Sequence, residues 1–537
     1  MGQVPAKLLE IRKRTDLSLR PTKHLKKTFT GFDGVERDLT IRYYQVQGVL
    51  HLASCPRFIL GDDTGLGKTL EAIIALCFLW EKNPDLKVLV MTTKSATPQW
   101  VKEFSKFTTG IQVIKCQGTA KQRLQAIDLW KSSTGPTVMV AGYRSVVKDF
   151  RQFQHESGYA LIYDEATAFK NQKTQIHQVC AHLSGQASRV WGLTATLIKN
   201  HLMEGHGIYS VIVPGLFGTA NNFMYYYCII EMMQLPKGRR VPRIVGYQPD
   251  KIVDFRENIA PYYYGRAKHE VATELPTLTI ERYEVDLTKE QESKYREALS
   301  GLLMVGETSE AGEEEREVTK LTSLIYCQQV VNDLELLECE GASAKLPTLI
   351  DLLTAGDLAE ENVIIFSRFK KMVDLIMPAL KKAKVKAVRV TGDESGDERQ
   401  KAQDAFQNPN SDTRVICITM AGGDAINLQA AKALIFFDLP WSAGDFLQII
   451  GRMIRIGSVH DRVLTLLLQA RGPTIGPTID QRVDATVFKK LDLIEAAIGA
   501  RLQGHVPSNG SGAIIPTGNE VGDIFNALKG DAQGLNA

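Results

Sequence analysis

A glycine-rich loop at residues 61–69 has the residue types and spacing needed to hold a chain of phosphates. It reads Gly-Asp-Asp-Thr-Gly-Leu-Gly-Lys-Thr, follows an apolar run and precedes a stretch with helical character. Glycines let backbone N–H groups turn inward around phosphate oxygens, and the first turn of a helix adds a favourable dipole. In such a loop Lys68 pairs with the β- and γ-phosphates, and the Thr69 hydroxyl holds Mg²⁺. The nucleotide-binding positions predicted here are Asp62, Thr64, Gly65, Leu66, Gly67, Lys68 and Thr69.

Two positions of this loop distinguish between phosphate-binding folds. Leu70 stands where a dinucleotide-binding loop would place its last glycine, which disfavours that fold. Asp62 departs from the strict triphosphate pattern, which has glycine at that position. The loop therefore favours a nucleoside triphosphate site with one unusual residue.

A pair of carboxylates follows another apolar run. The segment Ala-Leu-Ile-Tyr at residues 160–163 leads directly into Asp164 and Glu165. A triphosphatase needs acidic groups at a neighbouring strand end. Asp164 would bind Mg²⁺ through its water shell, and Glu165 would polarise the attacking water. Such a pair is weak evidence alone, but together with the loop it predicts ATP hydrolysis, with ATP and Mg²⁺ as the bound cofactors.

Two arginines near residue 450 could supply positive charge to the transition state. Phosphoryl transfer usually calls for an arginine beside the γ-phosphoryl group. Arg452 and Arg455 are three positions apart and share one face if this stretch is helical. Alone, such a pair is more often a solvated or salt-bridged surface, so these residues leave both interpretations open.

Short apolar runs that resemble strands alternate with longer stretches of helical character. The runs cover residues 58–60, 88–90, 138–140 and 161–163, and later 363–366, 388–390, 415–418, 434–437 and 464–468. Continuous apolar strands alternating with helices indicate parallel sheets covered on both faces. We therefore predict an α/β protein with two tandem lobes, and with helical material between and after them.

Composition excludes several classes of protein. The 537 residues are 44 % apolar and 23 % charged, which is typical of a folded chain of about three to four structural units. The net charge of +3 argues against a wholly basic nucleic-acid binder but permits a local basic groove. The 8 cysteines show no C-x-x-C pair, so we expect reduced thiols. Without a signal peptide or a membrane-length apolar run, the sequence predicts a soluble intracellular protein with no membrane partner.

The two ends of the chain differ in charge and composition. Residues 1–30 carry more Lys and Arg than acidic residues, which fits a solvated leader or an arm that contacts phosphates. After about residue 500 Gly, Asn and Ser become frequent, and we expect a loosely ordered tail. Within it, Ile524, Phe525 and Leu528 could form a docking segment for a protein partner.

In order and spacing, these segments resemble the superfamily-two helicase-like ATPases and, within them, the Swi/Snf-type DNA translocases. The similarity covers roughly residues 39–500. The matching segments lie at residues 39–48, 61–69, 92–103, 164–171, 193–200, 287–295, 365–367, 389–406, 419–428, 438–457 and 478–490. So many ordered matches make an accidental similarity improbable.

The resemblance implies two RecA-like lobes with ATP in the cleft between them. Gln45 is the implied adenine contact, and Arg452 and Arg455 of the second lobe join Lys68 and Glu165 as implied catalytic residues. Nucleic acid would cross both lobes on the opposite rim, held mainly through its phosphates and thus without sequence preference. The residues implied to contact nucleic acid, or to couple it to hydrolysis, are Thr194, Thr196, Ser367, Thr391, Gly422, Gly423 and Asn427.

The same comparison divides the chain into consecutive parts. They are a basic leader (1–38), an ATP-binding RecA-like lobe (39–205), a helical and aromatic inter-lobe region (206–345), a second RecA-like lobe (346–470), a bracing helix (471–500) and a flexible tail (501–537). Nearly the whole chain is therefore assigned to one motor.

We expect a DNA-dependent ATPase that translocates on duplex DNA and remodels DNA or DNA–protein complexes. The alternatives left open are a strand-separating or annealing helicase acting at forks or recombination intermediates, an RNA-directed enzyme, and a nucleic-acid-binding scaffold whose ATPase has decayed. The intact Lys68, Asp164 and Glu165 oppose the last of these. A compact motor of this kind suits a bacterial or viral context, with a cytoplasmic, nucleoid-associated location.

Overall fold

The structure is a computed structural model, and its chain forms two compact units. The described residues are 4–30, 36–234, 240–271, 275–305, 313–423, 426–455, 458–499, 524 and 528. The first unit comprises Met1–Ile230, Tyr247–Val271 and Ala496–Gly499, and the second comprises Glu231–Gly246, Ala272–Glu495 and Ala500–Ala537. Residues 237–239, positions 424–425 and 456–457 of two matched segments, and the tail apart from Ile524 and Leu528 lie outside the described residues.

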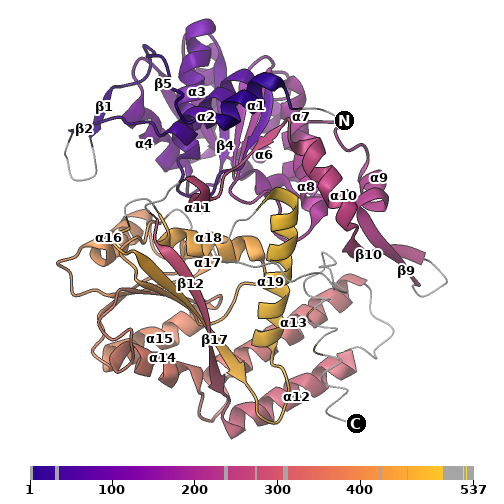
Figure 1. The fold of residues 1–537 in the computed structure, drawn as a ribbon, viewed down its shortest axis with the longest axis vertical. Helices are drawn as coiled ribbons and strands as arrows, with labels where there is room; N and C mark the ends of the chain where they lie inside the picture. Colours follow the sequence, from indigo (N-terminus) through magenta and orange to yellow (C-terminus); the bar gives the residue numbers. More distant parts are fainter. Residues whose placement is uncertain are drawn as a thin grey trace. The chain divides into compact units, whose positions relative to one another are not determined.

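The first unit is built on a parallel sheet with the strand order β11-β3-β8-β7-β4-β6-β5. Its N-terminal part, which includes β4 and β5, is drawn in indigo to purple in Figure 1. Its strands are β3 (Arg57–Leu60), β4 (Lys87–Thr92), β5 (Gln112–Cys116), β6 (Thr137–Gly142), β7 (Ala160–Asp164), β8 (Arg189–Leu193) and β11 (Tyr263–Tyr264). Its helices are α1 (Ala6–Lys13), α2 (Tyr43–Ser54), α3 (Lys68–Lys82), α4 (Thr97–Phe107), α5 (Ala120–Ser132), α6 (Tyr143–Lys148), α7 (Gln175–Gln186), α8 (Leu202–Ile212), α9 (Ala220–Tyr227), α10 (Pro249–Ile259) and α11 (Lys268–Val271). The four strands predicted for this part are confirmed.

Burial of both faces explains why the inner strands are continuously apolar. Every residue of β6 is buried, and so is every residue of β7 except Asp164. The helix after the phosphate loop is also apolar nearly all round, because α3 packs against α2 and contributes Ile73, Leu76 and Trp80 to the core that it shares with the sheet. Each fully buried side chain of this size stabilises the fold by about 1.5–3 kcal/mol. The sheet therefore gives a rigid base for the loops at its strand ends.

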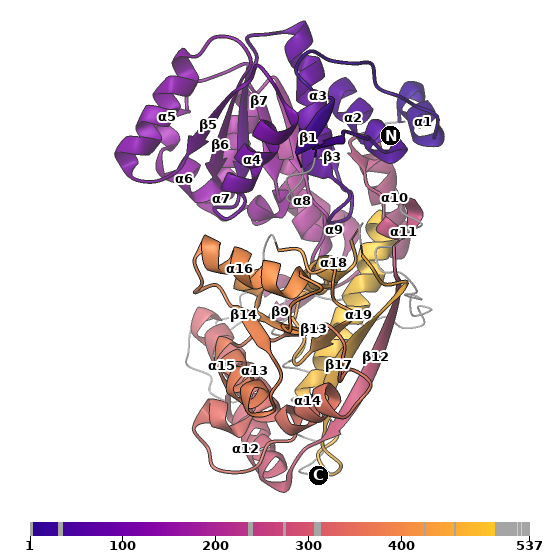
Figure 2. The same cartoon turned by 90° about the vertical axis from the view of Figure 1, so that its left-hand side faces the viewer.

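The second unit has a parallel sheet with the order β12-β17-β16-β13-β15-β14, which Figure 2 shows from β14 at one edge to β12 at the other. Its strands are β12 (Thr277–Asp286), β13 (Val363–Phe366), β14 (Ala387–Val390), β15 (Val415–Ile418), β16 (Ala433–Phe436) and β17 (Arg462–Arg471). Its helices are α12 (Lys289–Val305), α13 (Glu313–Asn332), α14 (Lys345–Thr354), α15 (Lys370–Lys382), α16 (Gly396–Gln407), α17 (Met420–Gly423), α18 (Ala443–Met453) and most of α19 (Ile479–Ile498). The five strands and the tandem α/β fold predicted from the sequence are confirmed.

Helices also cover both faces of the second sheet. One face of β13 presents Val363 and Ile365 to a core shared with α14 and α15. On the other face, rings pack in a row from β13 through β16 and α18 to α19, formed by Phe366, Phe436, Phe446 and Phe488. The period-two alternation along β13 thus places alternate residues in different cores.

The helix that follows the last strand is anchored by buried polar contacts. The backbone N–H of Ile479, at the start of α19, donates to the Tyr295 hydroxyl on α12 at 2.7 Å. One residue later, Asp480 pairs with the fully buried Lys345 at 2.5 Å. Arg282 on β12 then pairs with Asp484. These contacts hold α19 against the sheet, in the part of the chain for which the sequence predicts a bracing helix.

A strand pair, β9 (Cys228–Gln234) and β10 (Arg240–Tyr247), and the small pair β1 (Thr28–Thr30) and β2 (Glu36–Asp38) complete the described sheets. Of these, β1 and β2 are antiparallel. Among the described residues no helix combines the length and the apolar character that crossing a lipid bilayer requires. The tail positions Ile524 and Leu528 are helical and fully buried.

Candidate active site

The phosphate loop begins where β3 ends and finishes in the first turn of α3. Leu60 is the last residue of β3, and Lys68 is the first residue of α3. Gly65 and Gly67 have φ angles of 86° and 100°, a left-handed conformation that glycine adopts without steric cost. Left-handed turns of this kind let successive N–H groups face one side and bind an anion. The loop thus has the backbone conformation that phosphate binding requires.

Lys68 is half-buried, and its ammonium is bonded to the loop itself. Its Nζ donates to the carbonyl oxygens of Asp62 at 2.6 Å and Asp63 at 3.1 Å. Burial lowers the pKa of Lys68, although the surrounding carboxylates, Glu165 first among them, act in the opposite direction. A phosphate oxygen at this point would stabilise the charged form of Lys68 and replace the weaker carbonyl partners.

The two acidic residues predicted for the site follow each other at the end of β7. Asp164 is the last residue of the strand, and Glu165 has a φ of 55°, in the left-handed region. A non-glycine residue held in this conformation costs about 1–3 kcal/mol, and such strain is concentrated at functional sites. The Asp164 Oδ2 accepts hydrogen bonds from Thr92 Oγ1 and Trp100 Nε1, both at 2.7 Å. Burial, and next the charge of Glu165, raise the pKa of Asp164.

Strand order brings the loop and the carboxylates together where the parallel strands of the first sheet end. β8 lies between β3 and β7, with Leu193 in register with both Leu60 and Asp164. Thr194 follows directly, and its N–H donates to the Leu60 carbonyl at 3.2 Å. The Thr194 hydroxyl donates to the Thr196 carbonyl at 3.0 Å and accepts from the Thr196 N–H at 3.2 Å. The predicted coupling residues Thr194 and Thr196 therefore form a closed turn beside the phosphate loop.

Gln45 lies against the outer side of the phosphate loop. Its Nε2 donates to the Leu66 carbonyl at 3.1 Å, and its Oε1 accepts from the Arg42 N–H at 3.0 Å. A Cβ at Gly67 would lie 2.5 Å from this Nε2, so glycine is required there for the glutamine to approach. The side chain predicted to read adenine is thus next to the loop predicted to hold the phosphates.

Asp62, the unusual residue of the loop, points into a buried ion cluster. Its carboxylate is bound by Arg266, whose Nε donates to Asp62 Oδ1 at 2.8 Å and whose Nη2 donates to Oδ2. Arg266 Nη2 also donates to Glu71 Oε2 at 3.2 Å. What Asp62 can offer a nucleotide is therefore its backbone. Arg266 and Glu71 could not be predicted from the sequence, because no local pattern links them to the loop.

We expect Gly48→Ala to destabilise the first unit by about 1–3 kcal/mol, the usual cost of forcing a carbon into a filled interior. A Cβ at Gly48 would lie 1.6 Å from Glu71 Oε2 and 3.1 Å from Arg266 Nη2. Urea-induced unfolding measures the effect. Gly185→Ala on α7 is the matched control, because no described atom lies within 4 Å of its Cβ. An equal loss of stability in both variants would contradict the expectation.

In the second unit, the predicted catalytic arginines lie at the end of α18. Arg452 is buried in the last turn, and Arg455 follows the helix. Arg455 donates through Nη1 to Asn427 Oδ1 and through Nε to the Gly451 carbonyl at 3.1 Å. Burial, and next the charge of Arg452, lower the pKa of Arg455 to about 9. Within the described part of the chain no carboxylate pairs with Arg455, so this half-buried cation is suited to binding an anion.

Other predicted residues of the second unit take part in local polar contacts. Ser367 Oγ donates to Asp438 Oδ2 at 2.6 Å, and Thr391 Oγ1 donates to Glu394 Oε1 at 3.1 Å. A Cβ at Gly422 would lie 1.9 Å from the Val390 carbonyl oxygen, so only glycine fits there. Gly423 ends α17. The structure brings Asn427 and Arg455 into contact, whereas Ser367 and Thr391 bond to their own acidic neighbours.

The donor set of the first unit fits a magnesium ion bound with the nucleotide. Asp164 Oδ2 is held by two protein donors, and no described residue donates to its Oδ1. The Thr69 hydroxyl likewise makes no hydrogen bond within the described chain, and Thr69 lies in the first turn of α3. Both are oxygen donors of the kind that Mg²⁺ prefers. Thr69 and Asp164 are therefore the residues suited to hold the ion.

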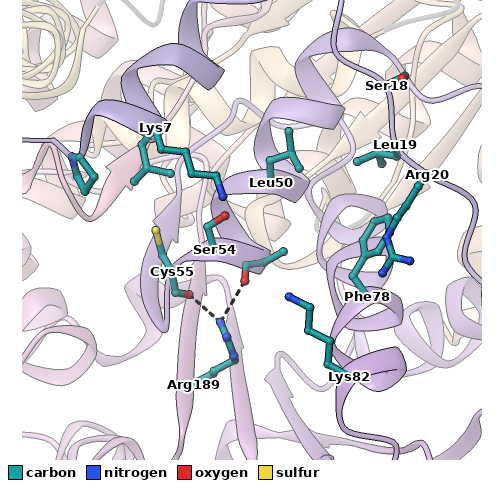
Figure 3. A pocket seen from close by; sticks show the side chains of 13 residues that line it. Lys7, Ser18, Leu19, Arg20, Leu50, Ser54, Cys55, Phe78, Lys82 and Arg189 are labelled. Carbon is teal, nitrogen blue, oxygen red and sulfur yellow. Dashed lines mark hydrogen bonds between the residues drawn. The ribbon is translucent and has the colours of Figure 1, made fainter.

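A basic pocket of 790 Å³ lies elsewhere on the first unit, at the start of β8 and the end of α2 (Figure 3). Its cationic lining is Lys7, Arg20, Lys82 and Arg189, and none of the described lining residues is acidic. Arg189 Nη1 donates to the carbonyls of Ala53 and Cys55 at the end of α2. The leader thus adds its charge to one pocket, but whether it contacts phosphates stays a prediction.

A strand leading into a glycine-rich loop with lysine and threonine at its end, beside an adjacent acidic pair, defines the P-loop class of nucleoside triphosphatases. Comparison with known proteins places the chain within that class. Residues 44–336 match the model of the SNF2-related domain, and residues 344–457 match that of the helicase conserved C-terminal domain. The chain therefore belongs to the SNF2-related family of helicase-like ATPases, as its motif order predicts.

Individual relatives agree with this assignment. Chromodomain-helicase-DNA-binding protein 1-like of Mus musculus is 26 % identical over 478 residues, which cover 86 % of this chain and 50 % of the relative. The ISWI chromatin-remodeling complex ATPase ISW1 of Saccharomyces cerevisiae is 26 % identical over 78 % of this chain and 37 % of its own length. The chain spans half or less of the length of these relatives.

One solved structure with a similar chain is the Sulfolobus solfataricus SWI2/SNF2 ATPase core in complex with dsDNA. It is 21 % identical, with a TM-score of 0.39, and the match covers 86 % of this chain and 98 % of that one. An uncharacterized ATP-dependent helicase of Mycoplasma genitalium, MG018, is 23 % identical over 85 % of this chain and 42 % of its own length.

Proposed function

We propose that this protein hydrolyses ATP to translocate along duplex DNA and thereby remodels DNA or DNA–protein complexes. One observation carries the proposal. Lys68, the Asp164–Glu165 pair and the Thr194–Thr196 turn all follow the carboxyl ends of neighbouring strands in one parallel sheet. The SNF2-related and helicase C-terminal matches, in the same order as the two sheets, support it.

The residues of the first unit have separate roles in the proposed reaction. Lys68 leaves the carbonyls of its own loop and binds the β- and γ-phosphates. Glu165 accepts a hydrogen bond from the attacking water and orients it toward the γ-phosphorus. Asp164, fixed by Thr92 and Trp100, holds the magnesium ion with Thr69. Bound Mg²⁺ neutralises charge on the phosphate oxygens. Gln45 is proposed to contact the adenine, and Arg452 and Arg455 to stabilise the transition state.

DNA is the proposed track, held through its phosphates and so without sequence preference. The names of the relatives, which include a DNA-binding helicase and a chromatin-remodeling ATPase, support this choice. Candidate contacts are the predicted residues Ser367, Thr391, Gly422, Gly423 and Asn427. The proposal also includes a protein partner for the tail. It further includes a cytoplasmic, nucleoid-associated location in a bacterial or viral host.

We expect duplex DNA to stimulate the ATPase rate at least about tenfold over the rate without nucleic acid, and more than single-stranded DNA or RNA. The physical reason is that translocation couples each hydrolysis event to a step along the bound strand, so the track must be present for fast turnover. Steady-state ATPase rates with each nucleic acid at equal phosphate concentration provide the measurement. Raising the salt concentration is the control, because phosphate contacts weaken steeply with salt.

Two outcomes would redirect the proposal. A higher rate with RNA than with duplex DNA would favour an RNA-directed enzyme. ATP-driven separation of a blunt duplex in a strand-displacement assay would favour the alternative helicase function.

A further inference from the structure

Three buried side chains form a charged cluster directly behind the phosphate loop. The side chains of Asp62 and Glu71 are 0 % exposed, and that of Arg266 is 4 % exposed. Arg266 binds both oxygens of Asp62, donates to Glu71 and also donates to the Tyr44 carbonyl. The Tyr264 ring lies 4.9 Å from its guanidinium carbon. The two partners lie more than 190 residues before Arg266, in the loop and in α3.

The charge balance shows which partner matters most. Burial alone lowers the pKa of Arg266, but the charges of Asp62 and then Glu71 outweigh burial and raise it. Burial, and next the charge of Asp62, raise the pKa of Glu71 well above its usual range. Glu71 Oε1 has no hydrogen-bond partner among the described residues. The essential ion pair is therefore the two-pronged contact between Arg266 and Asp62, with Glu71 as a weaker third member.

The backbone around Arg266 is fastened to the same strand and loop. Ile59 N donates to Tyr262 O and Gly61 N donates to Tyr264 O, both at 2.8 Å, which makes β11 a strand parallel to β3. The pairing continues into the loop, where Asp63 N donates to Arg266 O at 3.0 Å. Two further bonds return from this segment. Arg266 N donates to Asp62 Oδ1 at 3.0 Å, and Lys268 N donates to Asp63 Oδ2 at 2.9 Å.

These bonds act on the two residues that hold Lys68. The carbonyls of Asp62 and Asp63 accept from Lys68 Nζ, while their side chains are bound by residues 266–268 from behind. The position of the loop backbone, and with it the starting position of Lys68, is thus fixed from one side by a distant segment. A glycine at position 62, which the strict loop pattern has, would offer no side chain for this contact.

We propose that Arg266 is a positioning residue for ATP binding, which acts through Asp62 to hold the phosphate loop in its binding conformation. The proposal deepens the ATP site described above and depends on it. It explains why this loop has an aspartate at its second position, and why a single arginine contacts α2, α3 and the loop together. Lysine could not replace it fully, because a point charge cannot make the two-pronged contact.

The test is a double-mutant cycle on the full-length protein, with Arg266→Gln, Asp62→Asn and the double variant. KM for ATP and kcat are measured at saturating duplex DNA, with thermal unfolding recorded for each variant. Arg266→Gln and Asp62→Asn are each expected to raise KM about tenfold or more and to lower kcat less than about threefold. The double variant is expected to match the singles within about twofold, because both changes break one contact. Arg266→Lys should recover part of the loss in KM.

Arg57→Gln is the matched control for the removal of an arginine that bonds to the protein interior, because Arg57 is half-buried. Arg57 begins β3 at the end away from the phosphate loop, and its guanidinium donates to the carbonyls of Ile212 at 2.8 Å and Ser184 at 2.7 Å. The Arg57→Gln variant is expected to have a lower thermal midpoint of unfolding and an unchanged KM for ATP. If one single variant fails to fold, the double variant and Arg266→Lys still carry the comparison, since neither leaves the Asp62 carboxylate or the Arg266 guanidinium buried without the other's charge.

Three results would overturn the proposal. One is an Arg266→Gln variant that loses thermal stability as Arg57→Gln does but keeps its KM. Another is a double variant whose rise in KM equals the product of the two single effects, which would show that Arg266 does not act through Asp62. A third is an Arg266→Lys variant with the full loss of Arg266→Gln. Failure of the ATP site itself is separate, because unchanged turnover in Lys68→Ala would reveal it.

Discussion

Replacing Lys68 with alanine is expected to reduce ATP hydrolysis at least about a hundredfold, the scale on which one charge-stabilising contact affects turnover. Lys68 lies at the first turn of α3 with its ammonium against the loop carbonyls, from where it can reach the β- and γ-phosphates. The fold and the affinity for DNA are expected to persist. Steady-state ATPase rates measure turnover, and fluorescence anisotropy with labelled duplex DNA measures binding.

The control for this change is Lys82→Ala, which removes an exposed lysine from the last turn of the same helix. It should leave turnover within about twofold, because a lone surface substitution changes little. Unchanged turnover in Lys68→Ala would show that the loop is not the phosphate site.

Replacing Arg455 with alanine is expected to lower kcat about a thousandfold while changing KM for ATP less than about threefold. An arginine that stabilises charge on the transferred phosphoryl group acts mainly on the transition state, which produces this separation of the two constants. Arg455 is half-buried beside Arg452, and its side-chain partner is the neutral Asn427 amide rather than a carboxylate. Its charge is thus available to a phosphate.

Arg462→Ala is a suitable comparison, because Arg462 is an exposed arginine at the start of β17 in the same unit. Its kcat and KM should equal those of the unaltered protein. An Arg455→Ala variant whose KM rises while its kcat is unchanged would contradict a role in the transition state and favour a role in ATP binding.

The strands that could be predicted from sequence are those buried on both faces. β13, β15 and β16 are buried at every position, so their apolar runs are continuous. The outermost strands β5 and β12 were missed, because they alternate buried and exposed residues and carry charges among the apolar ones. The central strand β8 was also missed, since it contains Gly192. A Cβ there would lie 2.5 Å from Ile212 Cδ1, so its glycine reflects tertiary packing that no local pattern reveals.

The same distinction applies to the candidate site. The phosphate loop and the Asp164–Glu165 pair are contiguous in sequence, so their chemistry could be inferred from spacing. The hydrogen bonds of Thr92 and Trp100 to Asp164 depend on how β4 and α4 pack beside β7, and residue spacing does not encode that packing. The role of Arg266 is harder still to predict, because its carboxylate partners come from a segment about two hundred positions earlier in the sequence. Predicting it requires the register of β11 on β3.

That register also has a consequence for the order of events on the ribosome. β3 and the phosphate loop emerge early in synthesis, but β11 and Arg266, which complete that edge of the sheet, emerge only after all the other strands of the first unit. Until then the nascent unit exposes the edge of β3 and an unpaired carboxylate at Asp62. Contacts of such long sequence separation form slowly. If Arg266 positions the loop as proposed, the phosphate loop reaches its binding conformation late in translation, after most of the first unit has already been made.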